Sequence, residues 1–276
     1  MSAGNRFKGI LSTLGLLVAF QGCGGQQSPA YTQLDGTLWM QQSAEYWSIT
    51  TQTYRAARQQ LDRALGDRKW TAALEQSGDY GQLPPAVILD VDDTVLESTT
   101  YTAQRLLAGD NYTYDTWKVY IEEHGSRPIP GALEFCLYAA SKGVSIFYVT
   151  NNREELTRPI AAALRSHGFP VADDDSNVLT RTAERDKSAR RELVAAGHRV
   201  LLLLGDDGND FAPDLGNGTR DERAAAARKH ADRWGRSWFV LPNPMYGSWQ
   251  SALYSDAAPE GMQETVEAKL NSLDLK

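Results

Sequence analysis

Two acidic side chains follow a short apolar segment in this sequence. Asp90 and Asp92 come directly after residues 87–89, Val-Ile-Leu, and one residue separates them. A continuous apolar run is typical of a strand buried on both faces, as in a parallel sheet. Two carboxylates this close repel each other, and a bound cation would relieve that repulsion. A solvated acidic turn would give the same pair, so its chemistry depends on residues further along the chain.

Polar residues with related chemistry follow two further apolar runs. Thr150 ends the second run, and Asp206 and Asp210 follow the third, with Asp207 as an alternative to Asp210. Lys187 lies between these runs, at the start of an expected helix. Because the carboxyl ends of parallel strands lie side by side, we expect these groups to converge. A cluster of carboxylates suits a hard cation, above all Mg²⁺.

The elements that must position these residues alternate between strands and helices. This alternation predicts an α/β fold with a doubly wound, mainly parallel sheet and a smaller helical lid at about residues 97–127. Helical periodicity over residues 38–65 predicts one long helix before the first strand. The expected units are an amino-terminal helical segment (34–82), the core with its lid (83–255) and a carboxyl-terminal helical tail (256–276).

Composition restricts the function classes. The chain has 276 residues, enough for one large α/β domain with additional elements. Its formal net charge is −7 and no basic stripe is present, which argues against binding in a nucleic-acid groove. The cysteines are Cys23 and Cys136. The helical pattern around Cys136 predicts a buried structural thiol.

The first residues predict an export signal, a signal peptide at residues 1–23. Basic residues precede an apolar stretch at 10–20, and Gly-Cys follows, which resembles a bacterial lipobox. In a lipobox the cysteine, here Cys23, is lipidated and becomes the new amino-terminus. Residues 24–33 would then form a flexible tether. We expect an exported protein lipid-anchored to the bacterial outer membrane, or periplasmic or secreted if the lipobox is not used.

The ordered polar residues resemble those of the haloacid dehalogenase superfamily. The pattern Asp-x-Asp-x-Thr stands at residues 90–94, followed in order by Thr150, Lys187 and the pair Asp206 and Asp210. Further segments are similar to the class C acid phosphatases, bacterial lipoproteins that hydrolyse phosphomonoesters outside the cytoplasm, often as 5′-nucleotidases. These segments are Ile-Pro-Gly-Ala-Leu-Glu-Phe, Phe-Tyr-Val-Thr-Asn-Asn, Asp-Lys-Ser-Ala-Arg, Gly-Asp-Asp-Gly-Asn-Asp-Phe and Leu-Pro-Asn-Pro-Met-Tyr-Gly-Ser-Trp.

The resemblance implies a role for each catalytic residue. Asp90 would be the nucleophile that accepts the phosphoryl group, and Asp92 would be the general acid and base. Thr150 would donate to a phosphoryl oxygen, and Lys187 would hold the nucleophile and offset negative charge. Asp93 stands where these phosphatases usually have Glu, and no role follows for it.

The resemblance also implies a metal site for Mg²⁺. Asp90 and Asp206 would contribute carboxylates, and Asp92 its backbone carbonyl. Asp210 would orient waters around the metal.

Two aromatic residues match positions at which class C enzymes stack a nucleobase or an aromatic alcohol. Trp117 and Tyr246 are these residues, and Asn151, next to Thr150, is a third candidate for substrate binding. Facing rings favour flat leaving groups. The resemblance therefore implies small phosphomonoesters such as nucleoside monophosphates or aromatic phosphates. Packing of the lid alone would also account for the two rings.

Three alternatives stay open at this point. The protein could be a catalytically inactive surface-binding lipoprotein, which the intact set of acids, threonine and lysine disfavours. It could be a phospho-accepting receiver domain, which the export signal and the long helical preface fit badly. A phosphotransferase would use the same site with an alcohol in place of water.

Overall fold

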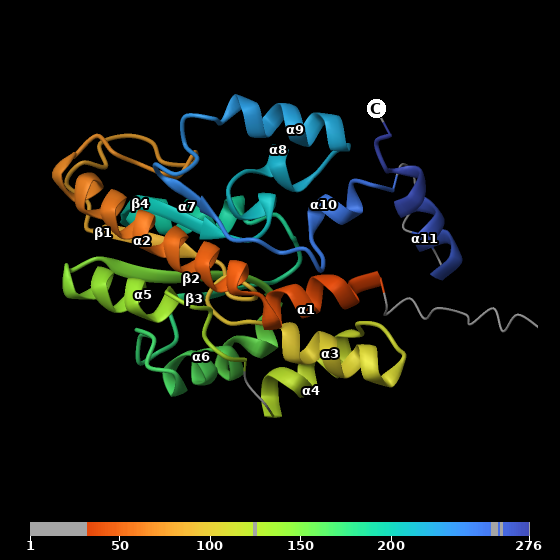
Figure 1. Cartoon of the computed structure of the whole chain (residues 1–276). Coiled ribbons are helices and arrows are strands. Elements are labelled where there is room, and N and C mark those ends of the chain that lie inside the picture. Colours follow the sequence, from red (N-terminus) through yellow and green to blue (C-terminus); the bar gives the residue numbers. More distant parts are fainter. Residues whose placement is uncertain (1–31, 124–125, 255–258, 260–261, 276) are drawn as a thin grey trace, which may run out of the picture.

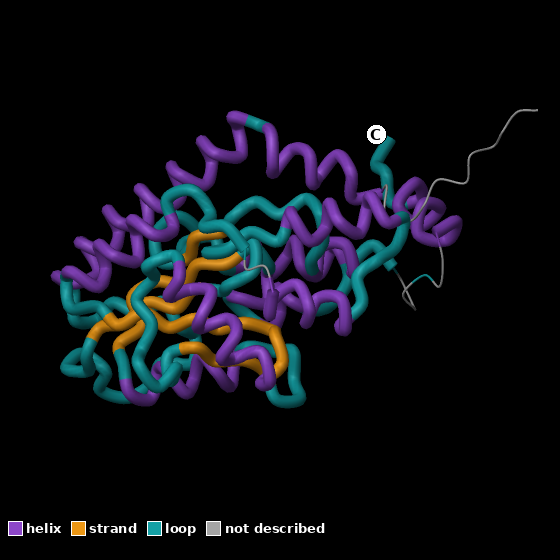
Figure 2. The backbone as a smooth tube through the Cα atoms, turned by 90° about the horizontal axis from the view of Figure 1, so that it is seen from below, coloured by secondary structure: helices purple, strands orange, loops and turns teal. Residues whose placement is uncertain are grey.

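A five-stranded sheet forms the centre of the protein (Figure 1). The computed structural model describes residues 32–123, 126–254, 259 and 262–275. The strand order is β3-β2-β1-β4-β5, and every neighbouring pair is parallel, which confirms the expected α/β fold. Helices surround the strands (Figure 2). The strands are β1 (Pro85–Leu89), β2 (Ser145–Arg153), β3 (Val178–Arg181), β4 (Arg199–Gly205) and β5 (Trp238–Val240).

The larger of two hydrophobic cores lies on one face of this sheet. Val87 and Leu89 point to that face, since alternate residues of a strand point to opposite sides. The helices that pack there are α2 (Ala44–Gly66), α5 (Ala132–Ser141) and α6 (Thr157–Ser166). Their apolar residues recur at three- and four-residue steps, so each helix presents one apolar stripe to the sheet.

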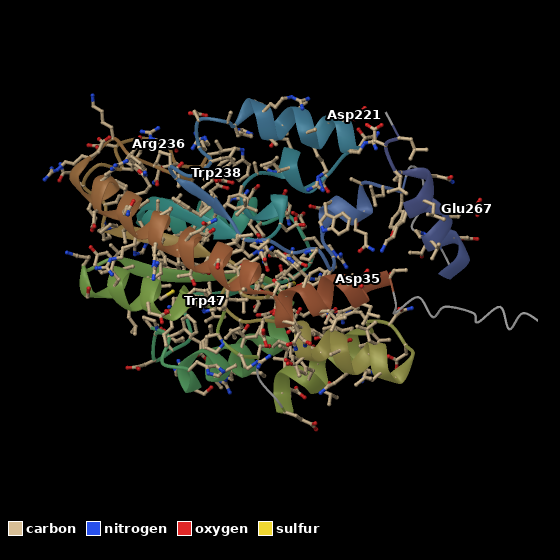
Figure 3. The ribbon with its side chains drawn as sticks, in the orientation of Figure 1. Asp35, Trp47, Asp221, Arg236, Trp238 and Glu267 are labelled. Atoms are coloured by element: carbon tan, nitrogen blue, oxygen red, sulfur yellow. The ribbon has the colours of Figure 1, made fainter. Side chains whose placement is uncertain are left out.

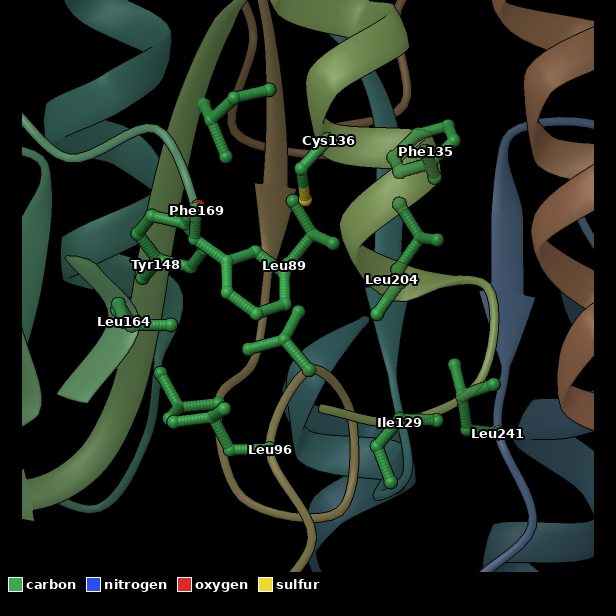
Figure 4. Close-up of a cluster of buried hydrophobic side chains, with 14 of the residues drawn as sticks. Leu89, Leu96, Ile129, Phe135, Cys136, Tyr148, Leu164, Phe169, Leu204 and Leu241 are labelled. Atoms are coloured by element: carbon green, nitrogen blue, oxygen red, sulfur yellow. The ribbon is translucent and has the colours of Figure 1, made fainter. Parts of the chain in front are cut away.

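Figure 4 shows the centre of this larger core. Phe135 and Cys136 of α5 lie near Leu89 of β1 and Tyr148 of β2. Cys136 is fully buried and unpaired, as predicted. Burial raises the pKa of its thiol to about 12, so this cysteine is a packing residue rather than a nucleophile.

The smaller core covers the opposite face. Ala86 and Ile88 point to that face. The helices that cover it follow β3 and β4 in the chain. These helices are α7 (Ser188–Gly197), α8 (Pro213–Gly216) and α9 (Arg220–Lys229). All seven residues of β4 are buried between the two cores. A strand buried on both faces needs apolar residues at nearly every position, which explains its leucine run.

Two helices, not one, precede the first strand. α1 (Leu34–Gln42) ends before Ser43, whose backbone is extended, and α2 then begins at Ala44. The Ser43 hydroxyl accepts a hydrogen bond from the backbone N–H of Tyr46 at 3.0 Å. Serine is a preferred residue at a helix amino-terminus because it satisfies a free backbone donor. The single helix predicted over residues 38–65 was therefore wrong at this position.

The segment between β1 and β2 contains the helices α3 (Thr99–Ala108) and α4 (Tyr114–Glu123). Its two ends meet, because Glu97 forms an ion pair with Arg127 at 2.6 Å and donates its backbone N–H to the Arg127 carbonyl at 2.9 Å. The segment therefore leaves the core and returns at one point. α3 lies beside α1 (Figure 1).

The remaining elements are short or peripheral. They are the 3₁₀ turns η2 (Glu154–Leu156) and η3 (Gly208–Asp210) and the helices α10 (Ser248–Ser251) and α11 (Met262–Asn271). In the described part of the chain, none of the helices combines the length and apolar character that crossing a membrane requires. The predicted signal peptide and Cys23 lie outside the described residues.

Candidate active site

The acids predicted to bind a metal meet at the carboxyl ends of β1 and β4. Leu89, the last residue of β1, pairs with Tyr148 of β2 and Leu204 of β4, so the residues just beyond these strands are neighbours. Asp90, Asp206 and Asp210 each offer a carboxylate oxygen, and these oxygens lie within 4.8 Å of one another. Asp90 and Asp210 are buried, and Asp206 is half-buried. The spacing and burial of these oxygens suit a small hard cation.

Lys187 is the cation among these acids. Its ammonium group donates to the carboxylate of Asp90, to Asp210 Oδ1 at 2.6 Å and to the carbonyl of Val149 at 2.7 Å. Burial alone would lower the pKa of Lys187, but Asp210 and Asp90 outweigh it, and the pKa is raised. Lys187 is therefore charged and holds Asp90 in place.

Asp92 lies beside this cluster and faces a different set of partners. Its Oδ2 accepts from the amide of Asn152 at 2.7 Å and from the Thr150 hydroxyl at 3.3 Å. Burial, followed by the charge of Asp90, raises the pKa of Asp92 to about 8. A carboxyl group with this pKa is protonated at neutral pH and can donate a proton.

Thr150 has no exposed surface, and its hydroxyl is engaged within the site. Besides donating to Asp92, the hydroxyl accepts from the backbone N–H and the side-chain amide of Asn152, at 3.2 and 3.0 Å. The expected donation to a phosphoryl oxygen would require the hydroxyl to turn from Asp92. Asn152 is thus central to the site, although the sequence pattern pointed to its neighbour Asn151 instead.

Two neutral donors orient Asp206. Asn243 donates to Asp206 Oδ2 at 2.8 Å, and the Thr94 hydroxyl donates to Oδ1 at 3.4 Å. Burial, with the charges of Asp90 and Asp210, raises the pKa of Asp206 well above its usual value. Asn243 lies in the segment after β5, and its role was not predicted from the sequence.

The structure separates Asp210 from Asp207. Asp207 faces away from the cluster, where it accepts from the Ser248 hydroxyl at 2.7 Å and from the Asn209 backbone at 2.9 Å. Asp210 is buried, and its Oδ2 accepts the Asp207 backbone N–H at 2.9 Å. Of these two acids, Asp210 is the one that joins Asp90 and Asp206.

Gly205 leaves room for the Asp210 carboxylate. A Cβ atom on Gly205 would lie 2.1 Å from Asp210 Oδ2, far inside van der Waals contact. The fully buried Arg191 adds a second constraint, because it donates to the backbone carbonyl of Asp210 at 3.2 Å and pairs with Glu75 at 2.8 Å. Backbone and side chain of Asp210 are thus both fixed.

Asp93 connects the loop after β1, which contains Asp90 and Asp92, to the aromatic residues. It is completely buried and has a φ of 58°, a left-handed conformation that is uncommon for a residue other than glycine. It accepts from the Ser98 hydroxyl and from the Tyr246 hydroxyl, each at 2.5 Å. Burial raises its pKa to about 6, although these hydrogen bonds oppose the rise.

A pocket of about 420 Å³ opens next to Asp92. Trp117, Tyr246 and Asn151, the three residues predicted to bind substrate, all line it. Tyr101, a weaker candidate for substrate binding on the same sequence grounds, also lines it. Several other lining residues were not predicted from the sequence. These are Gln33, Ser98, Thr102, Arg105, Tyr112, Asn152, Arg181 and Arg185.

Trp117 contributes both to packing and to the wall of this pocket. Its indole N–H donates to Asn152 Oδ1 at 2.6 Å. Its ring packs edge-on against the ring of Tyr101, with 5.0 Å between the ring centroids, and stacks on the ring of Tyr120, with 5.6 Å between the centroids. The Asn151 amide oxygen instead accepts from Arg190 at 2.7 Å, on the side of α7. Trp117 of α4 is therefore linked to Asp92 through the side chain of Asn152.

Comparison with known proteins gives the family of this chain. Residues 24–249 match the family model described as HAD superfamily, subfamily IIIB (acid phosphatase). The chain belongs to this acid phosphatase family. The matched range includes all the acids of the cluster, Lys187 and the aromatic pocket. Membership makes this protein a phosphomonoesterase of the HAD superfamily, so the surface-binding and receiver alternatives fall.

Solved structures agree with this family. The class C acid phosphatase from Bacillus anthracis is 29% identical, with a TM-score of 0.79 over 90% of this chain and 98% of its own. A second structure of that enzyme, with tungstate bound, is 27% identical, with a TM-score of 0.76 over 89% of this chain and 98% of its own. The phosphatase is therefore similar to this class C acid phosphatase over most of its length.

Proposed function

We propose that this phosphatase hydrolyses phosphomonoesters in two steps through an aspartyl-phosphate on Asp90. The observation that carries the proposal is the placement of Asp90, which Lys187 holds among the acids while Asp92, with its raised pKa, lies alongside. A nucleophile and a neutral carboxyl donor side by side are what transfer of a phosphoryl group to a side chain requires. The tungstate bound to the Bacillus anthracis enzyme, a tetrahedral oxyanion, is compatible with phosphate chemistry in this family.

The acid cluster supports Mg²⁺ as the cofactor. The carboxylates of Asp90, Asp206 and Asp210 lie close together, and Lys187 is the cationic partner of Asp90 and Asp210. The raised pKa values of Asp206 and Asp210 follow from burying negative charges together. These carboxylates and the Asp92 carbonyl would hold the ion. Once bound, Mg²⁺ would offset the negative charge of the phosphoryl oxygens.

In the first step the Asp90 carboxylate attacks phosphorus. A bond forms between the carboxylate and phosphorus, the bond from phosphorus to the ester oxygen breaks, and the leaving oxygen takes the proton of Asp92. In the second step the Asp92 carboxylate removes a proton from water as that water attacks phosphorus, which releases inorganic phosphate and Asp90. Lys187 keeps Asp90 oriented and stabilises the accumulating charge.

The leaving group would be aromatic or a nucleoside. Trp117, Tyr112 and Tyr246 line the pocket beside Asp92, where the leaving oxygen must lie to receive the proton. Flat rings bind favourably between aromatic side chains. Nucleoside monophosphates and aryl phosphates fit this requirement, which supports a 5′-nucleotidase-like activity.

Asp90→Asn tests the nucleophile. The amide has almost the same shape as the carboxylate but cannot form the phosphoryl intermediate, so kcat for p-nitrophenyl phosphate should fall by about 10³-fold or more. Asp207→Asn is the matched control for this variant, because Asp207 lies outside the cluster. Near-normal turnover by Asp90→Asn would remove Asp90 as nucleophile.

Removal of the metal ion tests the proposed cofactor. EDTA should abolish wild-type turnover, and Mg²⁺ should restore it.

We further propose that a lipid on Cys23 anchors the phosphatase to the outer membrane. The support is the amino-terminal sequence, in which an apolar stretch is followed by Gly-Cys. Cys23→Ala should move the protein from the membrane fraction to the soluble periplasmic fraction, as measured by fractionation and immunoblotting. Cys136→Ala is the control, since that thiol is buried in the core. Unchanged membrane association of Cys23→Ala would reject the anchor.

A further inference from the structure

The segment between β3 and α7 adds two arginines to the wall of the aromatic pocket. Arg181 is the last residue of β3, and Arg185 follows four residues later. Both line the pocket that Asp92, Trp117 and Tyr246 also line. The lining of the pocket therefore combines an acidic side chain, aromatic rings and the two arginines.

The charges of these two arginines are not neutralised by acids. Arg105, the third arginine of the pocket, forms an ion pair with Asp110 at 3.2 Å. Arg181 donates from Nε to the backbone carbonyl of Asn151 at 2.8 Å, which orients its guanidinium without neutralising it. Throughout the described ranges, no carboxylate lies within ion-pair distance of Arg181 or Arg185.

The loop that carries Arg185 is held at the site. Its backbone carbonyl accepts hydrogen bonds from the side chains of Asn209, at 2.8 Å, and Arg190, at 3.4 Å. Asn209 precedes the cluster acid Asp210. The position of Arg185 is thus coupled to the acid cluster, while its side chain is exposed toward the pocket.

Tyr112 lines the same pocket as Asp92, Arg181 and Arg185. Burial raises the pKa of its hydroxyl, the charge of Asp92 adds to the rise, and the charge of Arg185 opposes it. A ring bound beside Tyr112 would extend from the phosphoryl group toward the arginines.

We infer that Arg181 and Arg185 are specificity residues that recognise a second anionic group, a carboxylate or a phosphate, on the leaving group. Guanidinium groups bind such groups with two parallel hydrogen bonds. The chain has a net charge of −7 and an acidic site, yet neither arginine forms an ion pair with a carboxylate among the described residues. The inference rests on the proposed function for the phosphoryl end of the substrate.

Binding of phosphonates tests this without turnover, because their carbon–phosphorus bond is not hydrolysed. Isothermal titration in Mg²⁺ buffer would compare benzylphosphonate with its 3- and 4-carboxyl derivatives and with p-xylylenediphosphonate. The wild type should bind the best second anion on the order of tenfold more tightly than benzylphosphonate. This preference should shrink as salt rises. A carboxylate optimum or a phosphonate optimum would distinguish the two sources of the anion.

Arg185→Gln and Arg181→Gln should each reduce this preference, and the double variant should abolish it. Arg185→Gln alone should keep the fold, because the exposed Arg185 side chain has no ion pair among the described residues to lose. Arg236→Gln is the matched control, since Arg236 is an exposed arginine shortly before Trp238, the first residue of β5 (Figure 3). Because β5 is parallel to β4, Arg236 precedes the amino end of its strand, whereas the acids follow the carboxyl ends of β1 and β4. Its preference should equal that of the wild type. Equal binding of all ligands by the wild type, or a full preference in the double variant, would overturn the inference.

Turnover of phenyl phosphate by the wild type separates this inference from the proposed function. An arginine-dependent preference without turnover would support recognition of a second anion by Arg181 and Arg185 and would reject the two-step hydrolysis. Turnover without any preference would support the hydrolysis and reject the role of Arg181 and Arg185.

Discussion

At the scale of single residues, the site separates two aspartates that stand only two positions apart. Asp90 accepts from the ammonium group of Lys187, whereas Asp92 accepts from the neutral donors Asn152 and Thr150. Burial and the charge of Asp90 favour the neutral form of Asp92, and they outweigh the opposing charge of Lys187. In the proposed reaction Asp90 would attack phosphorus and Asp92 would donate the proton.

The pH dependence of turnover should reveal the proton on Asp92. An alkyl phosphate has a poor leaving group that needs this proton, so its kcat should fall as pH rises through the pKa of Asp92, about 8. p-Nitrophenyl phosphate leaves readily without a proton, and its kcat should depend less on pH. Rate profiles for both substrates would measure the difference. Identical profiles for the two substrates would reject Asp92 as the proton donor.

At the scale of elements, the turn from β4 into η3 fixes the second half of the acid cluster. The turn brings Asp210 back over Gly205, where the absence of a side chain makes room for the carboxylate. The Asp210 backbone N–H in turn donates to the Asp207 carbonyl at 3.0 Å. The chain therefore places Asp206 and Asp210 on one side of the turn and Asp207 on the other.

Gly205→Ala should disrupt this turn. The new methyl group would overlap the Asp210 carboxylate, and overpacking of this kind costs about 1–3 kcal/mol. We expect a lower free energy of unfolding and a weaker affinity for Mg²⁺, measured by denaturant titration and calorimetry. Gly197→Ala is the control, because a Cβ at that position meets no atom within 4 Å. If both variants behave like the wild type, the close approach at Gly205 is not needed.

At the scale of the whole molecule, the amino-terminal region supports a site that is distant in sequence. Glu75 pairs with the buried Arg191, which in turn donates to the Asp210 carbonyl. The Tyr54 hydroxyl of α2 donates to the carbonyl of Thr94 at 2.6 Å, within the loop that follows β1. The segment before β1 is thus part of the structure that holds the acids.

The cluster of buried acids should also set the pH dependence of stability. Burial raises the pKa of Asp92 to about 8 and that of Asp210 to about 7, against about 3.9 for an unfolded aspartate. The folded state then binds more protons, so the stability of the metal-free protein is highest at acid pH and is lost as pH rises through these values. Mg²⁺ favours the charged forms and should stabilise most at high pH.

Thermal melts of the metal-free and Mg²⁺-loaded protein would measure this effect. We expect Tm without metal to fall between about pH 5 and about pH 8, and the increase in Tm on adding Mg²⁺ to grow over the same range. Melts with Ca²⁺, or with added salt at the same ionic strength, provide the comparison for non-specific screening of the acidic charges. A Tm without metal that rises over this range would contradict the burial of several acids with raised pKa values.

The sequence predicted the parts of this molecule that depend on local patterns. Asp90, Thr150 and Asp206 follow apolar runs, and parallel strands bring the residues after such runs together. Lys187 precedes a helical pattern and reaches the same point. The break at Ser43 was missed because apolar periodicity continues across it, although serine is itself a capping signal.

Contacts between residues distant in the sequence were not predictable from the pattern. Asn152 and Asn151 are adjacent and of one type, and only the structure shows which of them faces Asp92. Arg191 and Glu75 lie 116 positions apart, and neither stands in a recognisable motif. Pairing across such distances depends on tertiary packing, which a single sequence does not encode in any local spacing.

Trapping of the covalent intermediate tests the central claim most directly. Borohydride reduces an aspartyl-phosphate to homoserine, which mass spectrometry of the digested protein can locate. During turnover with Mg²⁺, we predict homoserine at position 90 that depends on substrate and is absent from Asp90→Asn. Rapid turnover with no modification at Asp90, or modification at another aspartate, would contradict the account.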